Sequence, residues 1–219
     1  MLQKVSQNLG NTLARELAMA EEQAEVIAYG LEIILGSLIK FSVILLIAYI
    51  FGILGTTLTG FLTFILLRIL SGGVHFKGYF SCLIIGTIIL LLIGKISSMA
   101  HILLSLNLLK FTILFTGSVV FLICLQLAPA ENYNKKLTEG EKKKFKLFSG
   151  IFVLCWMCFA YLSVVLSGGE YNNFILASAL ALFIQGFTLM PQAYKIVGLL
   201  EMLIFKRKGG EQYVEKSVT

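Results

Sequence analysis

The feature that most constrains this chain is a long apolar segment, because no charged residue occurs from Phe41 to Leu67. A single helix over the 40 residues from Leu31 to Leu70 would be about 60 Å long, roughly twice the apolar core of a bilayer. The glycine- and threonine-rich stretch at 52–60 offers a break in the middle. The segment therefore predicts two membrane-spanning helices joined by a tight turn, over about 33–53 and 56–70.

Four more apolar segments predict further spans, over about 79–94, 110–128, 147–167 and 173–190. Pro129 and Pro191 end the second and fourth of these, because proline removes a helical hydrogen bond. The mixed segment 96–109 is expected to lie along the membrane surface. Together the segments predict an all-α polytopic membrane protein with about six transmembrane helices, built as one membrane-embedded domain over residues 1–219.

Both ends of the chain are patterned as amphipathic helices. The tail from Tyr194 to Lys208 and the first 28 residues mix charged and apolar side chains, as helices lying in a membrane interface do. The N-terminal segment lacks the continuous apolar core and the cleavage site of a signal peptide. We therefore expect insertion through internal spans, without cleavage.

The charge content agrees with a membrane location and indicates an orientation. Charged residues make up 14% of the chain and hydrophobic residues 58%, whereas soluble domains carry about 25% charged residues. The net charge of +6 indicates topology rather than nucleic-acid binding, because Lys and Arg accumulate in cytosolic loops. If both termini are cytoplasmic in a multi-pass protein of the cell membrane, 15 of the 18 Lys and Arg residues face the cytosol. The segment around His75 then lies on the cytoplasmic side.

The stretch from Arg68 to Cys82 carries the residue types of nucleophilic catalysis. A cysteine thiolate is a strong nucleophile, and a neighbouring base or positive potential favours its formation. A histidine within hydrogen-bond reach can take the thiol proton and later pass it to a leaving amine. His75 and Cys82 supply both types, seven residues apart.

That spacing does not suit a direct contact on one straight helix. Seven residues correspond to about 10.5 Å of rise, and helical side chains lean toward the N-terminus. Cys82 would then point back toward His75 while His75 points away. Gly78 tolerates a break, so we predict a turn near Gly78 and a new helix from about Tyr79, with Cys82 in its first turns. The positive end of that helix favours a thiolate.

Arg68 and the two glycines of this stretch each allow two interpretations. Arg68 either binds a substrate carboxylate or a developing oxyanion, or anchors the helix end at the interface. Gly72 and Gly73 either end a helix or let a substrate backbone approach. No metal is expected, because His75 and Cys82 are only two ligands and zinc sites use three or four. The remaining cysteines lie deep in apolar runs, so no disulfide framework is expected; they are Cys124, Cys155 and Cys158.

Three stretches of the chain resemble the AgrB family, the accessory gene regulator protein B of Gram-positive quorum-sensing systems. The first is Arg68-x-x-Ser-Gly-Gly73-x-His75 followed by Cys82. The second runs from Ala128 to Lys135 and is similar to the family's proline-led polar loop, although Lys136 stands where many relatives have proline. The third is the lead-in from Tyr29 to Ile33.

The resemblance implies a membrane-embedded cysteine endopeptidase that cuts an AgrD-type propeptide. It assigns Cys82 as the nucleophile and His75 as the base, with Arg68 and Gly73 at further positions on which activity depends. The acyl group would stay on the cysteine as a thioester until a Cys or Ser of the peptide displaces it, which closes a thiolactone or lactone ring. The resemblance implies a homodimer and no cofactor.

The lysines between 135 and 146 have two explanations. Lys135 and Lys136, with the lysines that follow, attract acidic segments of a substrate, or they only fix the membrane orientation. The rival to the enzyme as a whole is a membrane peptide exporter without proteolytic chemistry. A transporter would be expected to carry ionisable or broken-helix sites near the bilayer midplane, and the predicted span centres lack such charges.

Overall fold

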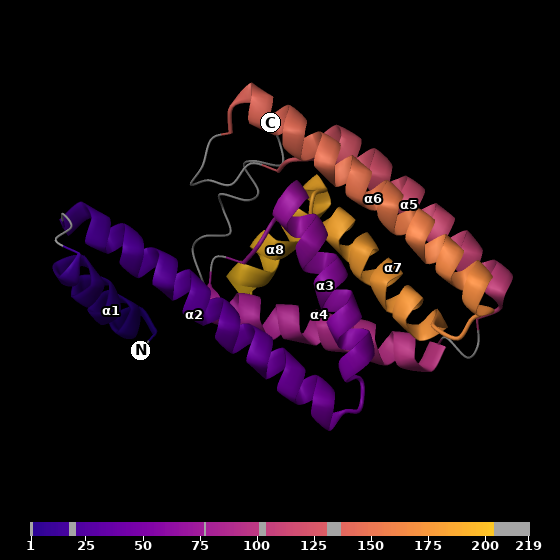
Figure 1. The fold of residues 1–219 in the computed structure, drawn as a ribbon, viewed down its shortest axis with the longest axis horizontal. Coiled ribbons are helices and arrows are strands. Elements are labelled where there is room, and N and C mark those ends of the chain that lie inside the picture. Colours follow the sequence, from indigo (N-terminus) through magenta and orange to yellow (C-terminus); the bar gives the residue numbers. More distant parts are fainter. Residues whose placement is uncertain (1, 18–20, 77, 101–103, 131–136, 204–219) are drawn as a thin grey trace. The chain divides into compact units, whose positions relative to one another are not determined.

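The computed structural model describes residues 2–17, 21–76, 78–100, 104–130 and 137–203. Within these ranges the chain forms helices and no strand, apart from one isolated bridge between Gly72 and Ala130. Figure 1 shows the helices, which are α1 (Leu2–Glu16), α2 (Glu21–Ile50), α3 (Leu54–Ser71), α4 (Tyr79–Ala100), α5 (Leu106–Leu127), α6 (Glu139–Ser167), α7 (Asn172–Phe187) and α8 (Pro191–Leu203). The predicted all-α class is confirmed.

The chain divides into two compact units, residues 1–47 and 48–219. The first unit contains α1 and most of α2. The buried face of α1 carries small residues at intervals of four, which are Ser6, Gly10 and Ala14. A Cβ on Gly10 would lie 2.8 Å from the Cβ of Ala28 on α2, so the two helices pack at close range, as small residues allow between membrane helices.

An adjacent face of α1 is apolar and exposed, as the predicted amphipathic helix requires. Its exposed apolar side chains recur every four residues, at Val5, Leu9 and Leu13, and the spacing continues at Leu17, directly after the helix. That spacing places them along one stripe of a helix. The predicted N-terminal amphipathic helix is therefore confirmed, and it ends at Glu16 rather than extending over 28 residues.

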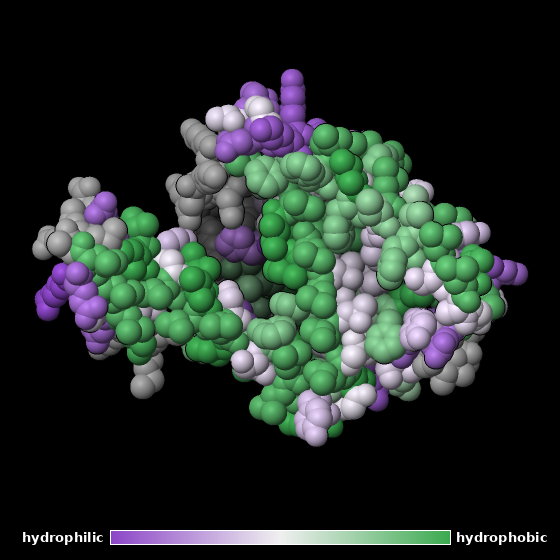
Figure 2. Space-filling model, in the orientation of Figure 1, coloured by the Kyte–Doolittle hydropathy of each residue, from purple (hydrophilic) through white to green (hydrophobic). Residues whose placement is uncertain are grey.

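In the second unit, α7 is the central helix. It contacts α3, α4 and α5, while α5 and α3 also contact α6, and Figure 1 shows α7 lying between α3 and the α5–α6 pair. Most of the side chains of α7 are buried. Figure 2 shows that the face of this unit in view is largely apolar, with a group of hydrophilic side chains over the start of α6. Apolar side chains on an outer surface suit a lipid environment.

In the described part of the chain, five helices are long and apolar enough to cross a membrane, or six if the bent pair α7–α8 counts as one span. The predicted turn between the first two spans lies at 51–53, where Gly52 has a φ of 66°. The third predicted span, α4, continues to Ala100, and α5 begins at Leu106. Residues 96–100 and 106–109 therefore belong to these two helices, and the expectation of a separate segment over 96–109 is wrong in its extent.

The sixth predicted span, 173–190, differs from the structure. α7 ends at Phe187, and its 16 residues give about 24 Å, short of a bilayer core of about 30 Å. The chain then bends by 85° into α8. Pro191 begins α8 rather than only stopping α7, because the first position of a helix needs no N–H donor. The predicted C-terminal helix thus starts at Pro191 and is described to Leu203, and residues 204–208 lie outside the described part.

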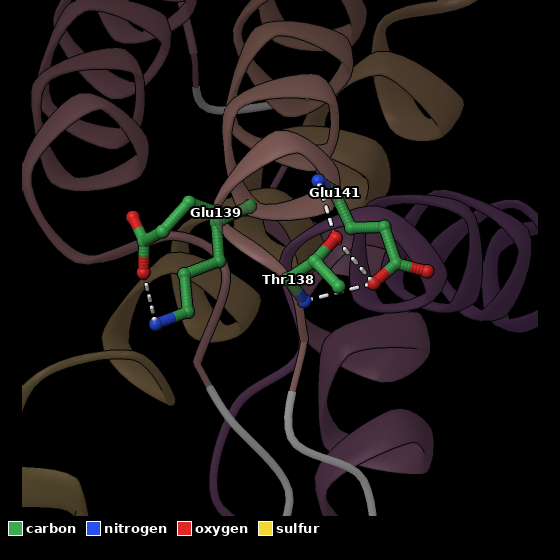
Figure 3. Close-up of polar contacts among 4 residues, drawn as sticks. Thr138, Glu139 and Glu141 are labelled. Atoms are coloured by element: carbon green, nitrogen blue, oxygen red, sulfur yellow. Dashed lines mark hydrogen bonds and ion pairs between the residues drawn. The ribbon is translucent and has the colours of Figure 1, made fainter.

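The fifth span begins earlier than predicted, inside the lysine-rich segment. Thr138 caps α6: its Oγ1 accepts from Glu141 N at 3.3 Å, and Glu141 Oε2 accepts from Thr138 N at 2.8 Å. Lys142 pairs with Glu139 at 2.9 Å (Figure 3). This capping box satisfies donors at the helix start and extends the helix two turns beyond the apolar run.

Candidate active site

Residues 72–76 and 78, between α3 and α4, are not helical, which is the break that the spacing of His75 and Cys82 requires. α3 ends at Ser71, Gly72 follows with a φ of 70° and donates its N–H to Arg68 O at 2.9 Å, and α4 begins at Tyr79. The predicted turn near Gly78 and the predicted helix start are confirmed. The break is wider than predicted, because it begins at Gly72.

One candidate catalytic residue lies within this break, and the other lies in the helix that follows it. Cys82 is in the first turn of α4, where its N–H donates to Gly78 O at 2.9 Å, and its side chain is half-buried. His75 lies in the non-helical segment with an exposed side chain, and its Nδ1 is 3.0 Å from Phe76 O. The position of Cys82 near the N-terminus of α4 favours a thiolate through the helix dipole.

Arg68 reaches from the last turn of α3 to the chain that follows it. Its Nη2 donates to the carbonyl oxygens of Gly73 and Val74, at 3.2 and 2.7 Å. Its Nη1 donates to Gln185 Oε1 at 3.3 Å and lies 3.5 Å from Thr188 Oγ1. Both terminal nitrogens of the guanidinium are thus engaged within the protein.

Gly72 and Gly73 are required by close contacts with other parts of the chain. Both have positive φ, 70° and 127°, a region that side chains disfavour. A Cβ on Gly72 would lie 2.6 Å from Ala130 O, and one on Gly73 would collide with Thr188. The helix-ending interpretation of Gly72 therefore agrees with the structure, and the backbone and side chains that approach these glycines belong to the protein itself.

Gln185 and Thr188, near the C-terminal end of α7, are the residues that sequence reasoning missed. The Gln185 side chain is fully buried, and its Nε2 donates to Gly72 O at 2.8 Å and to Ser71 Oγ at 3.1 Å. Thr188 O accepts from Val74 N at 3.0 Å. An uncharged amide near the end of an otherwise apolar span was the available signal, because a polar side chain in a membrane helix needs a partner.

The start of the polar loop lies beside the same turn. Ala130 N donates to Ser71 O at 2.9 Å, which forms the bridge to Gly72. The structure thus brings together two of the three stretches that carried the resemblance. Lys135 and Lys136 lie outside the described residues, so their predicted role stays a prediction. Among the described residues, no three His, Cys, Asp or Glu side chains gather as a metal site would require.

Comparison with known proteins identifies the family. The family model described as Accessory gene regulator B matches residues 6–189. The chain belongs to the AgrB family. The matched range contains the 68–82 stretch and also Gln185 and Thr188, and it ends before α8.

Two relatives from Clostridium perfringens support the assignment. The AgrB-like protein 2 of strain 13 / Type A is 29% identical over 181 residues, which is 79% of this chain and 80% of the relative. An AgrB-like protein of strain SM101 / Type A is 28% identical over 172 residues, covering 76% of this chain and 78% of the relative. No solved structure matches the chain. The predicted family is therefore confirmed.

Proposed function

We propose that this AgrB-family protein is a membrane-embedded cysteine endopeptidase that cleaves an AgrD-type propeptide and promotes cyclisation of the product. Membership of the family ties the chain to quorum-sensing propeptide processing. The observation that carries the chemistry is the break between α3 and α4. Because of this break, His75 is outside any helix while Cys82 is in the first turn of α4, so the two residues do not lie on one straight helix, where their spacing would argue against a contact.

In the proposed reaction, His75 takes the proton from Cys82 Sγ as the thiolate attacks the carbonyl carbon of the scissile peptide bond. The C–N bond breaks, His75 returns the proton to the leaving amine, and the acyl group remains on Cys82 as a thioester. A thiol or hydroxyl within the peptide then attacks that carbonyl. A ring forms, and the Cys82 thiol is regenerated. Exclusion of water from the site favours ring closure over hydrolysis.

The proposed setting is the cell membrane, with both termini and the 68–82 segment on the cytoplasmic side and a homodimer as the assembly. Lys135 and Lys136 would attract acidic segments of the propeptide. The lipid bilayer would supply the amphipathic propeptide, already bound to its surface.

The test uses the full chain in liposomes with its cognate propeptide. We expect Cys82→Ala and His75→Ala to abolish cleavage, while Cys155→Ala and His101→Ala leave the rate unchanged. Cys155 is an exposed cysteine of α6, and His101 is the other of the two histidines. Mass spectrometry of the wild type should detect an acyl adduct on Cys82 that hydroxylamine removes. Full cleavage by Cys82→Ala would exclude the proposed enzyme.

One feature favours the exporter as a second candidate. The 85° bend between α7 and α8 is a broken-helix element of the kind that transporters use. The same liposomes discriminate between the two functions. An exporter moves intact peptide across the bilayer in both the wild type and Cys82→Ala, and it cleaves the peptide in neither. The proposed enzyme cleaves the peptide in the wild type and leaves it uncleaved in Cys82→Ala.

A further inference from the structure

The backbone that leads into His75 is held by side chains from two helices. Three consecutive carbonyl oxygens precede His75, and each accepts a hydrogen bond: that of Gly72 from Gln185, and those of Gly73 and Val74 from Arg68. The N–H of Val74 donates to Thr188 O. Non-helical backbone at the end of a membrane helix loses its regular partners, and each buried unpaired group is costly. These side chains replace the missing helical bonds.

Gln185 is the residue that connects these contacts. Its Nε2 donates to Gly72 O and Ser71 Oγ, and its Oε1 accepts from Arg68 Nη1 and from Thr188 Oγ1, both at 3.3 Å. The side chain is 0% exposed. Its amide therefore holds the end of α3 through the donor and holds the guanidinium in place through the acceptor.

We infer that Gln185, assisted by Thr188, is a positioning residue for the catalytic pair. It acts through Arg68 and Gly72: it fixes the backbone at 72–74, and thereby the site from which His75 meets Cys82. This inference rests on the proposed function. It also gives Arg68 a role, because a guanidinium whose two terminal nitrogens bind Gly73, Val74 and Gln185 shapes the turn rather than chelating a substrate carboxylate.

The experiment compares Gln185→Met and Gln185→Glu with two matched controls. Methionine keeps the length and loses both polar functions. Glutamate keeps an acceptor for Arg68 and, when ionised, cannot donate to Gly72 O. Gln126→Met alters the exposed glutamine of α5. Ser178→Ala removes a buried contact of α7 two turns away, the 3.1 Å bond from Trp156 Nε1, and leaves the turn untouched.

Two measurements on the full chain in liposomes report on positioning. We expect Gln185→Met to lower kcat for propeptide cleavage about 100-fold, as a misplacement of about 1 Å does, with little change in KM. We also expect iodoacetamide to alkylate Cys82 about tenfold more slowly at pH 7 in Gln185→Met and in His75→Ala. At pH 10, where a thiol ionises without a base, the alkylation rates should be equal. The kcat and the alkylation rate at pH 7 of Gln185→Glu should lie between those of Gln185→Met and the wild type.

The outcomes separate this inference from the proposed function. If Cys82→Ala and His75→Ala are inactive but Gln185→Met keeps wild-type kcat and alkylation, the inference fails and the proposed function stands. If Cys82→Ala or His75→Ala still cleaves, both fail. If Ser178→Ala lowered kcat and the alkylation rate of Cys82 as much as Gln185→Met does, the effect would come from general packing and the inference would be overturned. Should Gln185→Met not fold, Thr188→Val carries the test, because it removes only the hydroxyl beside Gln185 and Arg68; wild-type behaviour there overturns the inference.

Discussion

The two ends of α3 are held by different interactions. At the Leu54 end, α4 approaches closely: Thr56 Oγ1 donates to Gly94 O at 3.0 Å, and a Cβ on Gly94 would collide with Thr57. At the Ser71 end the helix stops, and side chains of α3 and α7 hold the backbone that follows. One end is a contact between two complete helices, and the other is a turn with no regular partners.

This difference arises because a membrane offers no water to hydrogen-bond with backbone N–H and C=O groups. A complete helix satisfies its own hydrogen bonds, so close packing of small residues is enough to join two helices. A turn at the end of a membrane helix must find donors and acceptors elsewhere in the protein. The Leu54 end therefore supports the fold, and the Ser71 end, which leads to His75 and Cys82, shapes the candidate site.

The largest expected effect is at the Ser71 end, in Gly73→Ala. Gly73 has a φ of 127°, and a Cβ there would collide with Thr188. Strain of this kind costs about 1–3 kcal/mol, and relief of it would move the backbone next to His75. We expect cleavage in liposomes to fall about 100-fold or more.

Gly86→Ala is the control for that variant. Gly86 lies in α4, and a Cβ there would have no neighbour within 4 Å. Its cleavage rate should match the wild type. A Gly73→Ala protein as active as Gly86→Ala would show that the turn tolerates a side chain, and the contrast between the two ends of α3 would be lost.

A smaller effect on activity is expected at the Leu54 end, in Gly94→Val. The added side chain meets Thr57 and forces α3 and α4 apart, and overpacking typically costs about 1–3 kcal/mol. The thermal midpoint of the detergent-solubilised protein should fall. The cleavage rate per folded molecule should stay near that of the wild type, because the turn is not touched. If Gly94→Val lowered the cleavage rate as much as Gly73→Ala does, both ends of α3 would be needed to shape the candidate site.

The smallest effect is expected for Thr56→Val, which removes the hydroxyl that bonds Gly94 O. Hydrogen bonds between membrane helices contribute about 0.6 kcal/mol on average, so only a slight fall in the thermal midpoint should result. Thr59→Val is the matched control, because its hydroxyl bonds Gly55 O within its own helix. A larger shift in Thr59→Val than in Thr56→Val would contradict a role for the interhelical bond.

Much of the fold could be predicted from local patterns. The span boundaries agree within a few residues at α3, and the start of α4 at Tyr79 was predicted from the spacing of His75 and Cys82. Prediction from local patterns was poorer where contacts with distant parts of the chain lie at the end of a helix. α7 ends at Phe187 although its apolar pattern continues to Met190, and just after this end the carbonyl oxygen of Thr188 accepts from Val74 N of the turn after α3.

The apolar run from Phe41 to Leu67 was enough to show that this chain crosses a membrane, because helical spans are the simplest way to satisfy backbone groups in lipid. The residue types from Arg68 to Cys82 predicted the chemistry, and together with two further stretches they indicated the family. Only the tertiary structure revealed what holds that stretch in place. The partners of the turn, Gln185 and Thr188, are more than 100 residues away along the chain, and no local pattern determines which distant donor meets a given carbonyl.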